Sequence, residues 1–127
     1  MTDDQPDRLR ALEWIGGSKK DLLTLPREVV DVFGFALYLA QAGEKHAQAK
    51  PLRGFGSAAV LEIVEDRRGN TYRAVYTVRH AERVFVLHVF QKKSKSGIAT
   101  PKPDVELIRN RLKVAAMRAK ELQNEQT

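Results

Sequence analysis

The run Tyr72–Lys93 constrains the fold of this chain more than any other stretch. It holds two apolar segments, Tyr72–Val78 and Val84–Phe90, and both are rich in the β-branched and aromatic residues that favour strands. Between them lies Arg79–Arg83, a short polar segment that suits a hairpin connection. The sequence therefore predicts two antiparallel strands at the centre of a small sheet.

Side chains alternate between the two faces of a strand, so each predicted strand divides into two sets. In the first strand one face carries Arg73, Val75 and Thr77, and the other carries Tyr72, Ala74, Tyr76 and Val78. In the second strand we expect His88 to lie with Val84, Val86, Phe90 and Lys92, opposite Phe85, Leu87 and Val89. The charged members either lie at strand ends on a solvated face, as antiparallel sheets allow, or form a site together.

Length and composition suit a single globular domain over residues 1–127, with flexible tails expected at 1–7 and 121–127. No apolar run reaches the about 20 residues that a membrane span needs, and the N-terminus is acidic, so we expect a cytoplasmic protein without membrane contact. The chain has no cysteine, and His46, His80 and His88 lack metal-binding spacing. We therefore expect no metal site and no cofactor.

Charge is distributed unevenly along the chain. Residues 1–49 carry 6 basic and 8 acidic side chains, a net charge of −2, whereas residues 50–127 carry 16 and 8, a net charge of +8. Such an asymmetry favours a polyanionic partner, nucleic acid first, although a basic face can also receive an acidic protein.

The remaining segments complete an α+β pattern. Leu9–Ile15 is predicted to be an edge strand, and Ser18 to be the N-cap of a short helix that reaches Leu25. Residues 27–42 carry apolar side chains at spacings of three and four, which predicts a second helix. Residues 50–57 and 91–103 contain glycine and proline and are predicted to be loops.

A third strand is predicted over Ala58–Glu65, with turn residues leading into Tyr72, and a basic helix from Pro103 or Asp104. The predicted fold is thus a small antiparallel sheet, an N-terminal strand plus a three-strand meander, with two N-terminal helices and one C-terminal helix. Glu62 is the one acidic residue inside the meander. It is either an ion-pair partner of Arg73 or part of an acid/base pair in a cleft.

Four segments of the chain resemble a known family. They are Leu52-Arg53-Gly54-Phe55-Gly56, Tyr72-Arg73-Ala74-Val75-Tyr76, Val86-Leu87-His88-Val89-Phe90-Gln91-Lys92-Lys93-Ser94 and Thr100-Pro101. This pattern, which spans about residues 10 to 120, resembles the phage-derived HigB-like toxins of the RelE/ParE superfamily. The resemblance implies a RelE/ParE-like fold and the toxin of a type II toxin–antitoxin pair, typically a ribosome-dependent, metal-independent messenger-RNA endonuclease. It also implies a helix-turn-helix antitoxin as partner, in a toxin–antitoxin hetero-oligomer, and contacts with ribosome and mRNA.

The residues offer what metal-free RNA cleavage needs: proton transfer and stabilisation of the charge on the phosphorane. On motif position, the resemblance implies charge stabilisation by Arg73 and Lys92. Strand parity adds His88 or Glu62 as the group that transfers a proton. The basic residues expected to hold the RNA backbone are Lys50, Arg53, Lys93, Lys95 and Lys102.

Two other classes of function remain open at this point. A ParE-like protein would bind gyrase and leave RNA intact. A non-enzymatic module would use the basic strands and the terminal helix only as a docking surface for nucleic acid or protein.

Overall fold

The computed structural model describes residues 9–56, 59–79, 83–92 and 100–125. The elements follow in the order β1 (Ala11–Trp14), α1 (Ser18–Leu23), α2 (Arg27–Gln41), β2 (Ala49–Pro51), β3 (Val60–Arg67), β4 (Asn70–Arg79), β5 (Arg83–Lys92) and α3 (Lys102–Glu125). Their strands form one sheet in the order β1-β5-β4-β3-β2. The two predicted central strands are confirmed, since β4 and β5 are antiparallel neighbours in the interior of this sheet.

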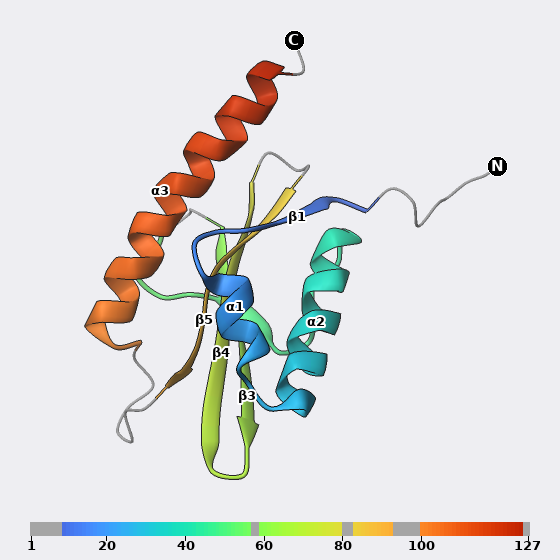
Figure 1. Ribbon diagram of the computed structural model, residues 1–127, viewed down its shortest axis with the longest axis vertical. Helices are drawn as coiled ribbons and strands as arrows, with labels where there is room; N and C mark the ends of the chain where they lie inside the picture. Colours follow the sequence, from blue (N-terminus) through green and yellow to red (C-terminus); the bar gives the residue numbers. More distant parts are fainter. Residues whose placement is uncertain (1–8, 57–58, 80–82, 93–99, 126–127) are drawn as a thin grey trace, which may run out of the picture.

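Helices cover both faces of the sheet (Figure 1). On one face, α2 packs against β3, β4 and β5, and its residues Phe33 and Leu37 join a core cluster with Ile63 and Tyr76. On the other face, α3 packs against β4 and β5, and its residue Ile108 is fully buried. We call these two clusters the α2-side core and the α3-side core. Burial of apolar surface on both faces of one sheet is the main source of stability in such a domain.

The predicted alternation of side chains holds for β3 and β4. Val60 and Val75 belong to the α3-side core, whereas Ile63, Ala74 and Tyr76 belong to the α2-side core. The predicted position of Tyr76, on the face opposite Arg73, is therefore confirmed.

Alternation in β5 is interrupted by a β-bulge, and our prediction for this strand is partly wrong. Val75 pairs with His88 but Tyr76 pairs with Val86, so Leu87 is an extra residue. Leu87 and His88 consequently face α3 together. Residues before the bulge exchange sides relative to the prediction: Val84 and Val86 lie in the α2-side core, opposite His88, while Phe85 and Leu87 lie on the same side as His88.

The sheet is mixed and five-stranded, where we predicted an antiparallel sheet of four strands. β1 is an edge strand as expected, but it runs parallel to β5, with Ala11 opposite Arg83. A parallel neighbour needs a long crossover connection, and the helices between β1 and β5 supply it. The predicted loop at residues 50–57 begins within β2, which pairs with β3 and places Lys50 opposite Glu62.

Two helix boundaries also differ from the prediction. Ser18 is the first residue of α1 and Gly17 is its N-cap, because the Ser18 hydroxyl is buried and donates to the Val86 carbonyl oxygen at 3.1 Å. α3 continues to Glu125, past the start of the tail that we expected at residue 121. Within the described ranges, no helix combines the length and the apolar character that a membrane span requires.

Candidate functional site

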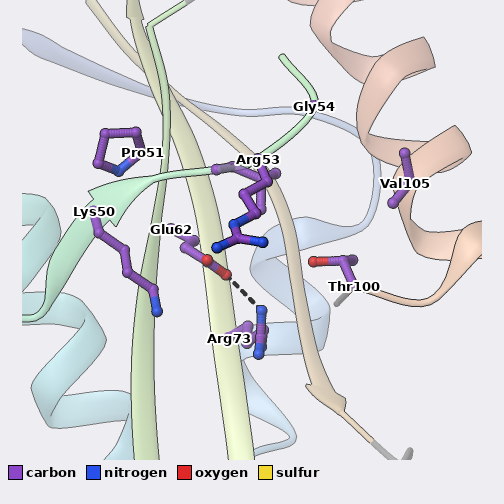
Figure 2. A pocket seen from close by; sticks show the side chains of 9 residues that line it. Lys50, Pro51, Arg53, Gly54, Glu62, Arg73, Thr100 and Val105 are labelled. Atoms are coloured by element: carbon purple, nitrogen blue, oxygen red, sulfur yellow. Dashed lines mark hydrogen bonds and ion pairs between the residues drawn. The ribbon is translucent and has the colours of Figure 1, made fainter. Parts of the chain in front are cut away.

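A cavity of about 460 Å³ opens between the β2–β3 end of the sheet and the beginning of α3. Its lining is made by Lys50, Pro51, Leu52, Arg53, Gly54, Glu62, Arg73, Thr100 and Val105. Figure 2 shows Lys50 and Arg53 extending toward the Glu62–Arg73 pair, with Thr100 and Val105 across the cavity. Three of these side chains are cationic and one is anionic, so the cavity is suited to an anionic ligand.

A buried ion pair lies in this cavity. Arg73 Nη1 donates to Glu62 Oε1 at 2.8 Å, and the side chains are only 6% and 7% exposed. β4 presents Arg73 opposite Val64 of β3, two pairs away from Glu62, so the two side chains meet diagonally on one face. Of the two interpretations of Glu62, the structure therefore contains the ion pair, and it also places that pair in a cleft.

Lys92 lies on the same face and is a buried cation. Burial lowers the pKa of its ammonium group below the ordinary value, the positive charge of Arg73 lowers the pKa further, and Glu62 partly opposes both effects. These influences indicate that Lys92, Arg73 and Glu62 form one electrostatic group. An ammonium whose pKa is lowered gives up its proton more readily than a lysine in water.

His88 lies on this face too, but it is held by α3. Its Nε2 contacts Asp104 Oδ1 at 2.7 Å, and its ring stacks on Phe90 with centroids 4.5 Å apart. The other ring nitrogen, Nδ1, is buried and has no hydrogen-bond partner among the described residues. His88 does not line the cavity that holds Arg73. The structure thus brings the four predicted catalytic residues to one sheet face, three of them as one electrostatic group and His88 beside it.

The predicted RNA-binding residues separate into three groups. Lys50 and Arg53 line the cavity and are exposed. Lys102 is the exposed first residue of α3 and is not part of the lining. Lys93 and Lys95 lie outside the described residues. Tyr76, whose buried phenol has a raised pKa, belongs to the core and not to the site.

Several residues of the site were not predicted from the sequence. Thr100 and Val105 form the wall on the α3 side, and Asp104 is the partner of His88. Their spacing along the chain carries no signal, because each contact depends on where α3 docks on the sheet. Among the described residues, no three histidine or acidic side chains gather in a way that could hold a metal ion.

Comparison with known proteins adds a family and a fold. The model of the family "Phage derived protein Gp49-like" matches residues 20–113. A variant of the E. coli toxin RelE, solved in the free state, is 22% identical, with a TM-score of 0.50 over 68% of this chain and 87% of that chain. The RelBE2 toxin–antitoxin complex from Mycobacterium tuberculosis gives 22% identity and a TM-score of 0.46, over 68% of this chain and 94% of that chain. No curated protein matches the sequence.

Proposed function

The chain belongs to the family of phage-derived Gp49-like proteins, and from this premise we propose that it is the toxin of a type II toxin–antitoxin pair. Its fold is RelE-like, so the fold expected from the sequence is confirmed, and the phage-derived family is confirmed by the family model. We propose further that it is an endoribonuclease that cleaves messenger RNA on the ribosome and so inhibits translation.

One observation carries the nuclease proposal: a buried arginine lies in a cavity whose lining has an excess of positive charge. Lys50 and Arg53 flank Arg73, and within the described part of the chain neither of these two flanking side chains contacts a carboxylate. A phosphate that entered the cavity could therefore be bound by cations that the fold has already positioned.

The proposed reaction is an in-line transfer within the RNA strand. The 2′ oxygen forms a bond to phosphorus as its proton leaves to a base, and the bond from phosphorus to the 5′ oxygen breaks. The 5′ oxygen then takes a proton from an acid, which yields a 2′,3′-cyclic phosphate and a 5′ hydroxyl. Charge on the phosphorane is greatest between these two events, and a fixed guanidinium stabilises it there.

The geometry favours a particular distribution of roles. Glu62 lines the cavity, carries its negative charge beside Arg73, and is our candidate for the base. Arg73 stabilises the phosphorane. Lys92, with its lowered pKa, is our candidate for the acid that protonates the 5′ oxygen. His88 is bound to Asp104 outside this cavity, and we propose that it positions the neighbouring part of β5.

The test compares cleavage by two double variants in translating ribosomes. Arg73→Gln with Glu62→Gln keeps a hydrogen-bonding pair and avoids an uncompensated buried charge, which single variants would leave. We expect the cleavage rate to fall by a factor of about 10³ or more, as it does when preorganised donors are lost. The matched control is Arg83→Gln with Glu13→Gln, which neutralises the 2.9 Å ion pair between β5 and β1.

The control should cleave at the wild-type rate, and both variants should keep the wild-type circular dichroism. Full activity of the Arg73/Glu62 variant would contradict the proposed site. DNA breaks with intact messenger would instead support the gyrase-binding alternative. Expression that leaves growth and messenger unchanged in the absence of any antitoxin would support the non-enzymatic alternative.

The partners follow from the same proposal. We propose a helix-turn-helix antitoxin that forms a hetero-oligomer with this chain, and the ribosome with its messenger as the target. The family relationship supports these partners. Co-expression with the product of an adjacent small gene tests the first partner, because a cognate antitoxin should restore growth and co-purify with the chain.

A further inference from the structure

Arg109 of α3 is held in place at the rim of the cavity. Its guanidinium carbon lies 4.7 Å from the centre of the Phe55 ring, and its Nη2 donates to the Gly54 carbonyl oxygen at 3.5 Å. Phe55 is itself fixed, since it is 7% exposed and belongs to the α3-side core. A guanidinium stacked on an anchored aromatic ring loses little further freedom when it binds a ligand.

Two independent connections place Arg109 beside the cavity. Gly54, whose carbonyl oxygen accepts from Arg109, is one of the lining residues. Val105 also lines the cavity, and it precedes Arg109 by four residues on α3, which puts both side chains on one helix face. Arg109 therefore joins the loop after β2 to α3 at the point where the two walls of the cavity meet.

The charge of Arg109 is not compensated by a described carboxylate. Five other arginines each contact one: Arg27, Arg67, Arg73, Arg83 and Arg118. Arg109 has an aromatic ring and a carbonyl oxygen as its contacts, and it remains exposed. An exposed, oriented guanidinium whose charge is unneutralised is well suited to bind a phosphate.

We propose that Arg109 is a second phosphate-binding position, which holds the RNA strand at the rim while Arg73 contacts the reacting phosphate inside the cavity. This inference deepens the proposed nuclease function and rests on it, because the ligand is the same single-stranded RNA. A strand that enters past Arg109 would cross the junction of the loop and α3 before it reaches Glu62 and Arg73. Arg109 acts in binding and takes no part in proton transfer.

The salt dependence of binding tests this inference. The probe is a short single-stranded RNA with methylated 2′ oxygens, which binds but cannot be cleaved. Each phosphate contact to single-stranded nucleic acid contributes about 0.7 to the slope of log affinity against log salt concentration. We expect Arg109→Gln to reduce the slope by about 0.7 and to weaken binding roughly fivefold near physiological salt.

Two further variants make the measurement specific. Arg109→Lys keeps the charge and should keep the wild-type slope. Arg27→Gln removes an exposed arginine from α2, on the other side of the sheet, and should change neither slope nor affinity.

A wild-type slope for Arg109→Gln would overturn the inference. So would equal weakening by Arg109→Gln and Arg109→Lys at an unchanged slope, which would indicate stacking on a base. If the wild-type protein binds and cleaves RNA while Arg109→Gln behaves identically, only the role of Arg109 fails. If the wild-type protein neither binds nor cleaves RNA, the proposed nuclease function fails with it.

Discussion

Lys92 shows at the scale of one residue how the site opposes stability. The residue is 8% exposed and lies within the electrostatic influence of Arg73, and the lowered pKa means that the folded protein holds this proton less tightly than the unfolded chain does. The charged form of Lys92 therefore reduces the stability of the fold at neutral pH. A mostly buried lysine that reduces stability in this way is a candidate functional residue.

Replacing Lys92 by methionine should separate stability from activity. We expect Lys92→Met to raise the free energy of unfolding at pH 7 by about 1 kcal/mol, since it removes a buried charge and keeps the side-chain volume. The same variant should lose RNA cleavage. Urea unfolding and cleavage in translating ribosomes measure the two effects. The control is Lys50→Met, at an exposed lysine that lines the cavity, and it should change stability by less than about 0.5 kcal/mol.

The difference in unfolding free energy between Lys92→Met and wild type should become smaller as the pH rises. Below the lowered pKa, Lys92 is charged in both the folded and the unfolded state, and the free-energy cost of holding this charge in the folded state is fully present. As the pH rises through that pKa toward the ordinary value of 10.5, the folded state loses its proton first and the penalty is relieved. Wild type should therefore approach Lys92→Met in stability at alkaline pH, and a constant difference would contradict the assignment.

At the scale of elements, α3 is fixed to the sheet by contacts with the turn after β1. Arg111 Nη1 donates to the Leu87 carbonyl oxygen at 2.9 Å, at the bulge of β5. The same guanidinium covers Gly16, whose φ of +59° turns the chain from β1 into α1. This corner therefore links β1, β5 and α3, although the three elements are distant in sequence.

A methyl group at Gly16 should disturb this corner. A Cβ there would lie 2.8 Å from Arg111 Cζ, and the positive φ disfavours any side chain, so we expect Gly16→Ala to lower the free energy of unfolding by about 2 kcal/mol. Gly34→Ala is the matched control, because its Cβ would meet nothing within 4 Å and it lies within α2. Thermal unfolding should show the control at or above wild-type stability.

Most elements were predictable from the sequence, because their signals are local. Apolar periodicity indicated α2, and β-branched runs indicated β3, β4 and β5. The direction of β1 was not predictable, since no hairpin connects it to β5 and pairing across a long connection leaves no local pattern. The bulge was equally hidden: Val84, Val86 and Leu87 are all buried, so no polar residue marks the change of side.

At the scale of the molecule, two cores share one sheet, so they should unfold together. Trp14, the only tryptophan, packs against the α2-side core, whereas Ile108 is buried in the α3-side core.

The candidate site also depends on contacts between residues that are distant in the sequence. Sequence parity indicated which residues share a face within each strand, but the registers that bring Arg73, Glu62 and Lys92 to one face come from the pairing of distant strands. The walls made by Thr100 and Val105 depend on how α3 docks.

Trp14 fluorescence should report a change made on the opposite face. We expect Ile108→Ala to lower the free energy of unfolding by about 3 kcal/mol, because it leaves a cavity in a fully buried site. The Trp14 transition in urea should shift together with the circular dichroism of the whole chain. Val114→Ala, at a half-exposed position of α3, is the control and should shift the transition little. Separate transitions for the two probes would show that the cores unfold independently.

The bulge in β5 separates a first half, whose residues serve in packing, from a second half that carries the candidate site residues His88 and Lys92. Residues 83–86 precede it, while His88, Phe90 and Lys92 follow it on the side of α3. Deleting Leu87 should close the bulge, because Val86 and His88 would become consecutive residues opposite Tyr76 and Val75, and Lys92 would keep its side. The extra residue thus adds one apolar side chain toward α3 at no cost to the sidedness of the charged residues that follow it.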